Sequence, residues 1–251
     1  MLVRNVRDVA PRPGLEHIVA RTVLGSVAMP PRVFTDPTMS LTEYDVEPGW
    51  ELTGFEGHEG REELYYIIEG EGLMKVGPYQ RPVARGDLTL IPAGERHQLI
   101  NTSQGLLRML CLGGKPEGET PPERFKQHRS ALFVRNAATT VVTPGAEGCE
   151  LRILFKEEER MFESSLIFFT DYVIQPGRAN VGHSHQDREE ANFILEGEGI
   201  IRTEADERRI REGDGIYIPR GERHQFLNDS KTPLHFVHFA ARASSTQEMW
   251  E

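Results

Sequence analysis

The sequence predicts an all-β protein made of two similar barrel domains in tandem. Two observations lead to this prediction. The chain of 251 residues carries an internal repeat, and each copy consists of short apolar segments separated by turn residues. The 24 glycines and 16 prolines also favour many strands and turns over long helices.

The internal repeat is clearest in IPAGERHQLIN at residues 91–101, which returns as IPRGERHQFLN at residues 218–228. Identity in the same order along the whole chain indicates two homologous halves. Further matches at similar offsets are YIIEGEG (66–72) with FILEGEG (193–199), RGD (85–87) with EGD (212–214), TEYDVEPG (42–49) with TDYVIQPG (170–177), and VRN (3–5) with VRN (134–136).

The repeat divides the chain into an N-terminal domain over residues 1–128 and a C-terminal domain over residues 129–251. The segment 113–130, GGKPEGETPPERFKQHRS, is rich in glycine, proline and charge, and we interpret it as the connection between the domains. Helical structure is expected only in this segment and in the C-terminal tail.

Each half contains a series of predicted short β-strands. Runs such as ANFILEG, GIYIP and LHFVHFA are apolar, rich in β-branched and aromatic residues, and bounded by glycine, proline or asparagine. This pattern is typical of strands in a sandwich or a small barrel.

Charge and composition exclude several classes of function. The net charge is −10 and no run of lysine and arginine is long enough to follow a phosphate backbone, so we expect no nucleic-acid partner. No segment has the length and apolarity of a signal peptide or a membrane span, so we expect a cytoplasmic protein without a membrane partner. Cys111 and Cys149 are too few for a disulfide framework or a zinc ribbon.

A group of possible metal ligands stands in the second half, in GHSHQDREEANFILEG. His183 and His185 are two residues apart, so on a strand they project from the same face. Glu190 opens the next apolar strand, and His224 follows a Pro-x-Gly turn. Three imidazoles and one carboxylate suit a divalent transition metal such as Fe, Mn, Ni, Cu, Co or Zn. A His-x-His pair taken alone is more often structural than ligating.

These residues match a longer pattern, and the chain resembles the bicupins of the cupin superfamily, in particular quercetinase-like metal-dependent dioxygenases. The resemblance implies two jelly-roll β-barrels, each with its site in the barrel interior, and a homo-oligomer, with a dimer expected first. The first cupin motif is matched by Gly177, His183, His185, Glu190 and Gly197, and the second by Gly213, Pro219, Gly221, His224 and Asn228. The ligands it implies are His183, His185, Glu190 and His224.

The first half carries the same motifs with one change. Its aligned positions are Glu56, His58, Glu63 and His97, so a carboxylate replaces the first imidazole. Such a set can bind a divalent ion, and its additional negative charge favours a harder one such as Mn or Fe(II). The alternative is a degenerate barrel in which these side chains hydrogen-bond one another.

Strand alternation indicates which neighbouring side chains face the two sites. Asn192 and Ile194 are expected to point inward with Glu190, and Phe193 outward. Asn192 would either hydrogen-bond a ligand carboxylate or contact the substrate. Tyr65 takes the inward place in the first half that Asn192 has in the second.

Other polar residues near the motifs have simpler expected roles. Glu59, Arg61 and Glu62 are expected to form a solvated rim. His235 and His238 lie on opposite faces of the last strand, so one of them should face the barrel interior. A structural role is favoured for both, with His238 the tentative catalytic residue of the two.

The leading hypothesis for function is a metal-dependent dioxygenase that acts on a small organic substrate and O₂ in the C-terminal barrel. In this hypothesis Glu190 takes a proton from the substrate, and Asn192 and His238 are tentative catalytic residues. One alternative is a non-oxidative isomerase, lyase or hydrolase in which the ion polarises a carbonyl. The other alternative is a non-catalytic protein that binds a small molecule.

Overall fold

We describe the fold from a computed structural model, in which residues 1–13, 15–25, 33–35, 39–58, 61–114, 132–159 and 166–242 are placed. Most of the expected connecting segment, and the tail beyond residue 242, lie outside these described residues. The helical structure expected in those two places is therefore not part of the description. No helix within the described ranges is long and apolar enough to cross a membrane.

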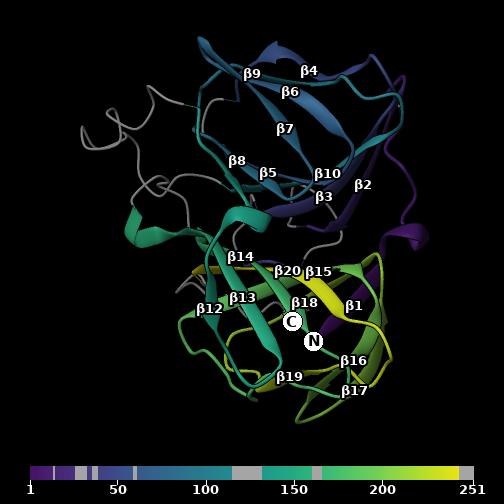
Figure 1. Ribbon diagram of the computed structural model, residues 1–251, viewed down its shortest axis with the longest axis vertical. Helices are drawn as coiled ribbons and strands as arrows, with labels where there is room; N and C mark the ends of the chain where they lie inside the picture. Colours follow the sequence, from purple (N-terminus) through teal and green to yellow (C-terminus); the bar gives the residue numbers. More distant parts are fainter. Residues whose placement is uncertain are drawn as a thin grey trace.

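The N-terminal barrel consists of two antiparallel sheets and occupies the upper part of Figure 1. Its larger sheet has six strands in the order β11-β8-β5-β10-β3-β2, and its smaller sheet has four in the order β4-β9-β6-β7. The strands are β2 (Ile18–Leu24), β3 (Ser40–Val46), β4 (Glu51–Glu56), β5 (Glu62–Glu69), β6 (Glu71–Val76), β7 (Tyr79–Ala84), β8 (Asp87–Ile91), β9 (His97–Asn101), β10 (Leu107–Gly114) and β11 (Val134–Asn136).

The C-terminal barrel repeats this arrangement in the lower part of Figure 1. Its larger sheet has seven strands in the order β1-β18-β15-β20-β14-β13-β12, and its smaller sheet has three in the order β17-β16-β19. The predicted all-β class with two barrels is confirmed. The strands are β1 (Leu2–Asn5), β12 (Val142–Pro144), β13 (Cys149–Lys156), β14 (Leu166–Ile174), β15 (Arg188–Glu196), β16 (Glu198–Thr203), β17 (Glu207–Arg211), β18 (Asp214–Ile218), β19 (His224–Leu227) and β20 (Leu234–Arg242).

The two barrels exchange their first strands. Strand β1 comes from the first half of the chain but pairs with β18 of the C-terminal barrel, and β11 of the second half pairs with β8 of the N-terminal barrel. The repeated VRN and R/E-G-D motifs meet at these exchanges. Asn5 Nδ2 donates to Asp214 Oδ1 at 2.7 Å, and Asn136 Nδ2 donates to Asp87 Oδ1 at 2.8 Å. Each barrel is thus completed by the other half, while the division of the chain at residues 128 and 129 stays a prediction.

Within the residues that the structure describes, three single turns of 3-10 helix appear where the sequence led us to expect none. They are η1 (Val6–Asp8), η2 (Ala137–Thr139) and η3 (Glu157–Glu159). The first two follow the exchanged strands, and in each an asparagine side chain accepts a hydrogen bond from a backbone N–H of the turn. Asparagine favours this capping geometry, so the two exchange strands end in the same local structure.

Buried apolar side chains form three clusters. One fills the N-terminal barrel and includes Ile67 and Leu99, and another fills the C-terminal barrel and includes Ile194 and Ile216. The largest draws residues from both halves, because the six-stranded and seven-stranded sheets pack with their outer faces together (Figure 1). Phe193 belongs to this cluster, which confirms that it faces out of its own barrel.

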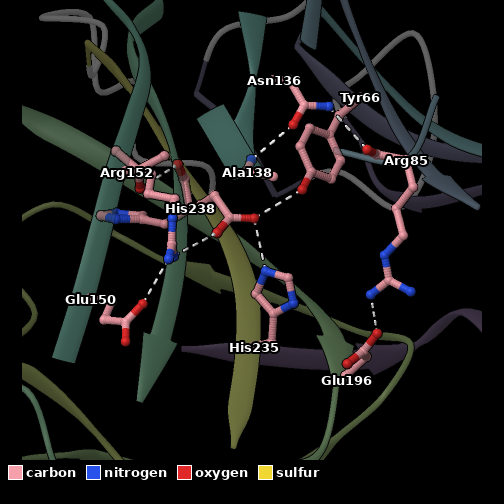
Figure 2. A network of polar contacts seen from close by, with 11 residues as sticks. Tyr66, Arg85, Asn136, Ala138, Glu150, Arg152, Glu196, His235 and His238 are labelled. Carbon is pink, nitrogen blue, oxygen red and sulfur yellow. Dashed lines mark hydrogen bonds and ion pairs between the residues drawn. The ribbon is translucent and has the colours of Figure 1, made fainter. Parts of the chain in front are cut away.

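A polar network crosses the contact between the barrels (Figure 2). The Tyr66 hydroxyl, from the N-terminal barrel, donates to Asp171 Oδ2 at 2.9 Å, and His235 Nε2 lies 2.8 Å from the same oxygen. Arg152 Nη1 is 3.6 Å from Asp171 Oδ1. Burial acts to raise the pKa of Asp171, but the hydrogen bonds from His235 and Tyr66 outweigh it and the pKa falls below its usual value. Asp171 therefore remains an ionised acceptor that joins the two barrels.

Replacing Tyr66 with phenylalanine removes one hydrogen bond to this buried carboxylate. We expect the free energy of unfolding of Tyr66→Phe to fall by about 1–3 kcal/mol, because Asp171 keeps its charge and loses a donor. Urea unfolding measures the change. Tyr79→Phe, which alters a tyrosine that is 41% exposed, is the control and should stay close to the wild type. Equal unfolding midpoints for the two variants would contradict this role for Tyr66.

Glu43 on β3 lines a cavity between the barrels and is 6% exposed. Burial and the neighbouring carboxylate of Asp45 raise the pKa of Glu43 from 4.5 to about 7. A carboxyl group whose pKa is higher in the folded than in the unfolded state binds its proton more tightly when folded. Ionising it therefore destabilises the fold, and its effect on stability grows as the pH rises from about 4.5 to about 7.

We expect Glu43→Gln to be more stable than the wild type at pH 8, by about 1–2 kcal/mol, and nearly equal to it at pH 5. Denaturant unfolding at the two pH values measures this difference. The matched control is Glu71→Gln, which changes an exposed carboxylate on β6 and should give the same small effect at both. A Glu43→Gln variant that is less stable at pH 8 than at pH 5, relative to the wild type, would contradict the assignment.

Candidate metal centre

The C-terminal barrel brings its predicted ligands together from three places in the chain. Glu190 lies on β15 and His224 begins β19. His183 pairs with His224 through two backbone hydrogen bonds, of 3.1 and 2.9 Å, although it belongs to no strand. The carbonyl of His185 accepts a hydrogen bond from the N–H of Gly221 at 2.6 Å, which holds the histidine loop against the Pro-x-Gly turn.

The side chains of this group converge on the carboxylate of Glu190. His183, Glu190 and His224 each offer one ligand atom, and these atoms lie within 4.8 Å of one another. His224 Nε2 is 3.0 Å from Glu190 Oε2, and His185 Nε2 is 3.2 Å from Oε1. His238 Nε2 is 3.4 Å from Oε1. The structure therefore gathers all four predicted ligands and adds His238 as a neighbour.

The carboxylate of Glu190 is buried, yet neither of its oxygens has a hydrogen bond of normal geometry among the described residues. Burial opposes its ionisation, but His238 and His224 outweigh this effect and lower the pKa of Glu190 far below its usual value. Glu190 is thus an ionised carboxylate that faces several imidazole nitrogens without accepting a well-formed hydrogen bond. Such unpaired buried charge is normally compensated by a cation or a metal.

Backbone carbonyl groups at Nδ1 fix the orientation of two imidazoles. His183 Nδ1 lies 2.8 Å from the carbonyl oxygen of Val181, and His224 Nδ1 lies 3.0 Å from that of Glu222. A carbonyl can only accept, so each Nδ1 carries a proton and each Nε2 faces the centre. Burial lowers the pKa of His183, which favours the neutral ring, whereas the hydrogen bond and charge of Glu190 outweigh burial and raise the pKa of His224. The donor set therefore fits a divalent transition metal.

A cavity of about 490 Å³ opens onto this group. Its walls are mainly apolar, and Asn192 and His238 lie in its lining with His183 and His224. Both amide atoms of Asn192 and the Nε2 of His238 are buried without a hydrogen-bond partner among the described residues. The lining also includes Lys156, Phe168, Tyr172, Arg188 and Phe236.

Strand alternation placed these side chains as expected. Asn192 and Ile194 face inward. His235 faces the contact between the barrels and is hydrogen-bonded to Asp171, in keeping with a structural role. His238 lines the cavity, and its Nε2 lies 3.4 Å from Glu190 Oε1 without a hydrogen bond of normal geometry among the described residues, so its role stays a prediction.

The N-terminal barrel also brings the corresponding side chains together, but they make different hydrogen bonds. His58, Glu63 and His97 each have a ligand atom within 4.8 Å of the others. Glu56 ends β4 opposite His97, but its side chain lies outside the described residues. The Tyr65 hydroxyl donates to Glu63 Oε2 at 3.2 Å and lies 3.1 Å from His97 Nε2. Tyr65 thus faces inward as expected and contacts the other members of the group.

Two residues expected on a solvated rim are largely withdrawn from solvent, Glu62 being buried and Arg61 half-buried. Glu62 is 2% exposed. The side chain of Arg61 is 21% exposed, and its Nε donates to Glu63 Oε1 at 2.9 Å. Arg61 and Glu63 are two residues apart, so strand alternation could have placed them on one face. The third rim residue, Glu59, lies outside the described residues.

Comparison with known proteins gives the class of the protein. Residues 42–113 and 170–240 both match the Cupin domain family. The chain belongs to the cupin family, and its two domains make it a bicupin.

Two further proteins are similar in sequence to part of the chain. It is 34% identical over 86 residues to an uncharacterized protein of Methanocaldococcus jannaschii, across 34% of this chain and 68% of that protein. It is 34% identical over 65 residues to an oxalate-binding protein of Thermotoga maritima, across 26% of this chain and 54% of that protein.

Solved structures share the fold over nearly the whole chain. A mutant of Bacillus subtilis oxalate decarboxylase has a TM-score of 0.75 at 17% identity, across 97% of this chain and 78% of that chain. A putative glyoxylate-induced protein from Pseudomonas aeruginosa has a TM-score of 0.74 at 14% identity, across 96% and 86%. At these identities the likeness establishes the fold.

We expect His224→Ala to weaken binding of Mn²⁺ or Co²⁺ by at least about 100-fold, since it removes a nitrogen that faces the centre. Titration calorimetry on metal-free protein measures the loss. His17→Ala, which removes an imidazole outside both groups, is the control and should bind as the wild type does. Equal metal binding by the two variants would contradict the assignment of His224 as a ligand.

Proposed function

We propose that the chain is a metal-dependent enzyme whose centre lies in the C-terminal barrel. In this proposal His183, His185, Glu190 and His224 hold one divalent transition metal ion, and a small organic substrate occupies the cavity beside it. The observation that carries the proposal is the buried, ionised carboxylate of Glu190, which faces imidazole nitrogens but lacks hydrogen bonds of normal geometry. The similarity of fold is in keeping with this, because Mn(II) centres have been characterised in Bacillus subtilis oxalate decarboxylase.

The cavity suggests the kind of substrate. Aromatic rings of Phe168, Tyr172 and Phe236 contribute to its wall, so it suits an organic molecule with a flat or apolar part. Lys156 and Arg188 add positive charge to the lining. A small organic acid would satisfy both features.

The chain's own residues supply binding and proton transfer. Asn192 can donate and accept at the same time, so its unpaired amide can orient a substrate oxygen or N–H group. Glu190 can take a proton from the substrate, and His238 Nε2, 3.4 Å from Glu190 Oε1, can receive or return it. When bound, the metal ion would supply Lewis-acid polarisation of a substrate oxygen.

The first candidate reaction is oxidation by O₂, as in a dioxygenase. The second is a non-oxidative reaction of an isomerase, lyase or hydrolase. It is favoured by His238 Nε2, which has no hydrogen bond of normal geometry among the described residues, and by the likeness of fold to a decarboxylase. A non-catalytic binding role is the third, supported by the similarity to an oxalate-binding protein. Assembly as a homodimer stays a prediction.

The experiment that separates these candidates compares turnover of a panel of organic acids in air and under argon. The protein is loaded in turn with Fe, Mn, Ni, Cu, Co or Zn, and substrate loss and O₂ consumption are measured together. We expect turnover that consumes O₂ stoichiometrically and stops under argon. Turnover that continues unchanged under argon excludes the dioxygenase and selects the second candidate. Saturable binding of a compound that is never converted selects the third.

We expect His238→Gln to lower kcat by about 10²–10⁴-fold with a smaller change in KM, because it removes a proton carrier and retains a polar side chain. Metal content of the variant, measured in parallel, should equal that of the wild type. His235→Gln is the matched control on the opposite face of the same strand and should retain kcat. A wild-type kcat in His238→Gln would rule out a role for this residue in the chemical step.

A further inference from the structure

We infer that the metal-ligand set of the N-terminal barrel is closed to metal, because the guanidinium of Arg61 occupies the place of the cation. The two barrels have the same fold and matching motifs, so each supplies the control for the other. The two barrels differ in a row of three residues that are register partners on neighbouring strands. They also differ in the position of the arginine that stands two residues before the glutamate of each row.

In the N-terminal barrel the row consists of Glu63, Gly113 and Ser40. Gly113 on β10 is the register partner of Glu63 on one side and of Ser40 on the other. Arg61 lies across this row. Its Nε donates to Glu63 Oε1 at 2.9 Å, and its Nη2 donates to Ser40 Oγ at 2.9 Å.

The glycine in this row makes room for the arginine. A Cβ atom built on Gly113 would lie 2.1 to 2.3 Å from the nitrogen and carbon atoms of the Arg61 guanidinium. Contacts this short do not occur between real atoms, so an alanine at this position would displace the guanidinium. Gly113 does not require a positive φ, and the constraint on it is therefore the space that Arg61 takes.

In the C-terminal barrel the same row consists of Glu190, Ala240 and Phe168. Ala240 on β20 is the register partner of both Glu190 and Phe168. Arg188 stands two residues before Glu190, as Arg61 stands before Glu63. It turns away from the carboxylate, donates to both oxygens of Asp187 at 3.0 and 2.9 Å, and lies 5.9 Å from the centre of the Phe168 ring. Ala240 and Phe168 thus hold the register positions that Gly113 and Ser40 hold in the other barrel.

The ligand atoms of the two barrels differ accordingly. Glu63 Oε1 is bonded to Arg61, while Glu63 Oε2 accepts from Tyr65 and lies 3.2 Å from His97 Nε2. In the C-terminal barrel neither oxygen of Glu190 has a hydrogen bond of normal geometry among the described residues.

The charge of Arg61 also disfavours a metal ion in this group. Arg61 and Glu63 form an ion pair, so a divalent cation would have to break this pair and lie beside the guanidinium. Two positive charges beside one buried carboxylate repel each other strongly. The N-terminal group is therefore a metal-free ion-pair centre, and metal binding is confined to the C-terminal barrel.

The test measures metal binding by both barrels in one titration. Binding of Mn²⁺ is followed by electron paramagnetic resonance, and metal content is measured after Co²⁺ loading and desalting. We expect the wild type to bind one equivalent and His224→Ala to bind none. In the His224→Ala background, Arg61→Gln should restore one equivalent, and the further change His97→Ala should remove it again.

A second variant displaces Arg61 from Glu63 without removing the positive charge of the arginine. Gly113→Ala recreates the alanine of the C-terminal row and should displace Arg61 from Glu63. In the His224→Ala background it too should create a site that depends on His97. Arg61→Lys is the matched control, because it retains the positive charge, and it should bind no metal in that background.

Two results would overturn the inference. One is an equivalent of metal that His224→Ala retains with Arg61 intact and that His97→Ala removes. The other is a failure of both Arg61→Gln and Gly113→Ala, each folded by circular dichroism, to create any site. A wild type that binds no metal at all would instead contradict the centre proposed for the C-terminal barrel. These outcomes are distinct because the His97-dependent site is measured in its own background.

Discussion

Each barrel buries one carboxylate at its centre, and the need to compensate that charge organises what surrounds it. An ionised carboxylate removed from water costs several kcal/mol unless it is paired or bound to a metal. Glu63 is compensated by Arg61 and by contacts with Tyr65 and His97. Glu190 faces the imidazoles of His185, His224 and His238. The same buried group thus belongs to an ion pair in one barrel and to a cluster of imidazoles beside a cavity in the other.

The open centre depends on packing that lies outside it. The C-terminal barrel is completed by β1 from the other half, and its outer face is covered by the N-terminal barrel. This covering allows β15 to carry Phe193 on one face and Asn192 on the other, so that one strand serves both the contact between barrels and the cavity. The N-terminal barrel therefore contributes to the site as a support, independently of any ion.

Repetition explains why much of the site was visible in the sequence. His183, His185 and Glu190 are close together in the sequence and His224 is distant from them, so the resemblance to the two cupin motifs was needed to combine them. The inward position of Asn192 needed only the period of a β-strand. Whether Arg61 turns inward was not accessible in this way, because it depends on Gly113, which is distant in the sequence and becomes its neighbour only through strand register.

By itself the sequence determined the class and the two barrels, and it predicted where both candidate ligand sets lie, because repeats and motifs are properties of the chain alone. Only the tertiary structure decided that the two VRN segments exchange between barrels, since the acceptors Asp87 and Asp214 belong to the opposite domain. It also decided the contacts of each candidate site. The Arg61 guanidinium lies in the space that Gly113 leaves beside Glu63, and steric contact across a sheet has no local signal in the sequence.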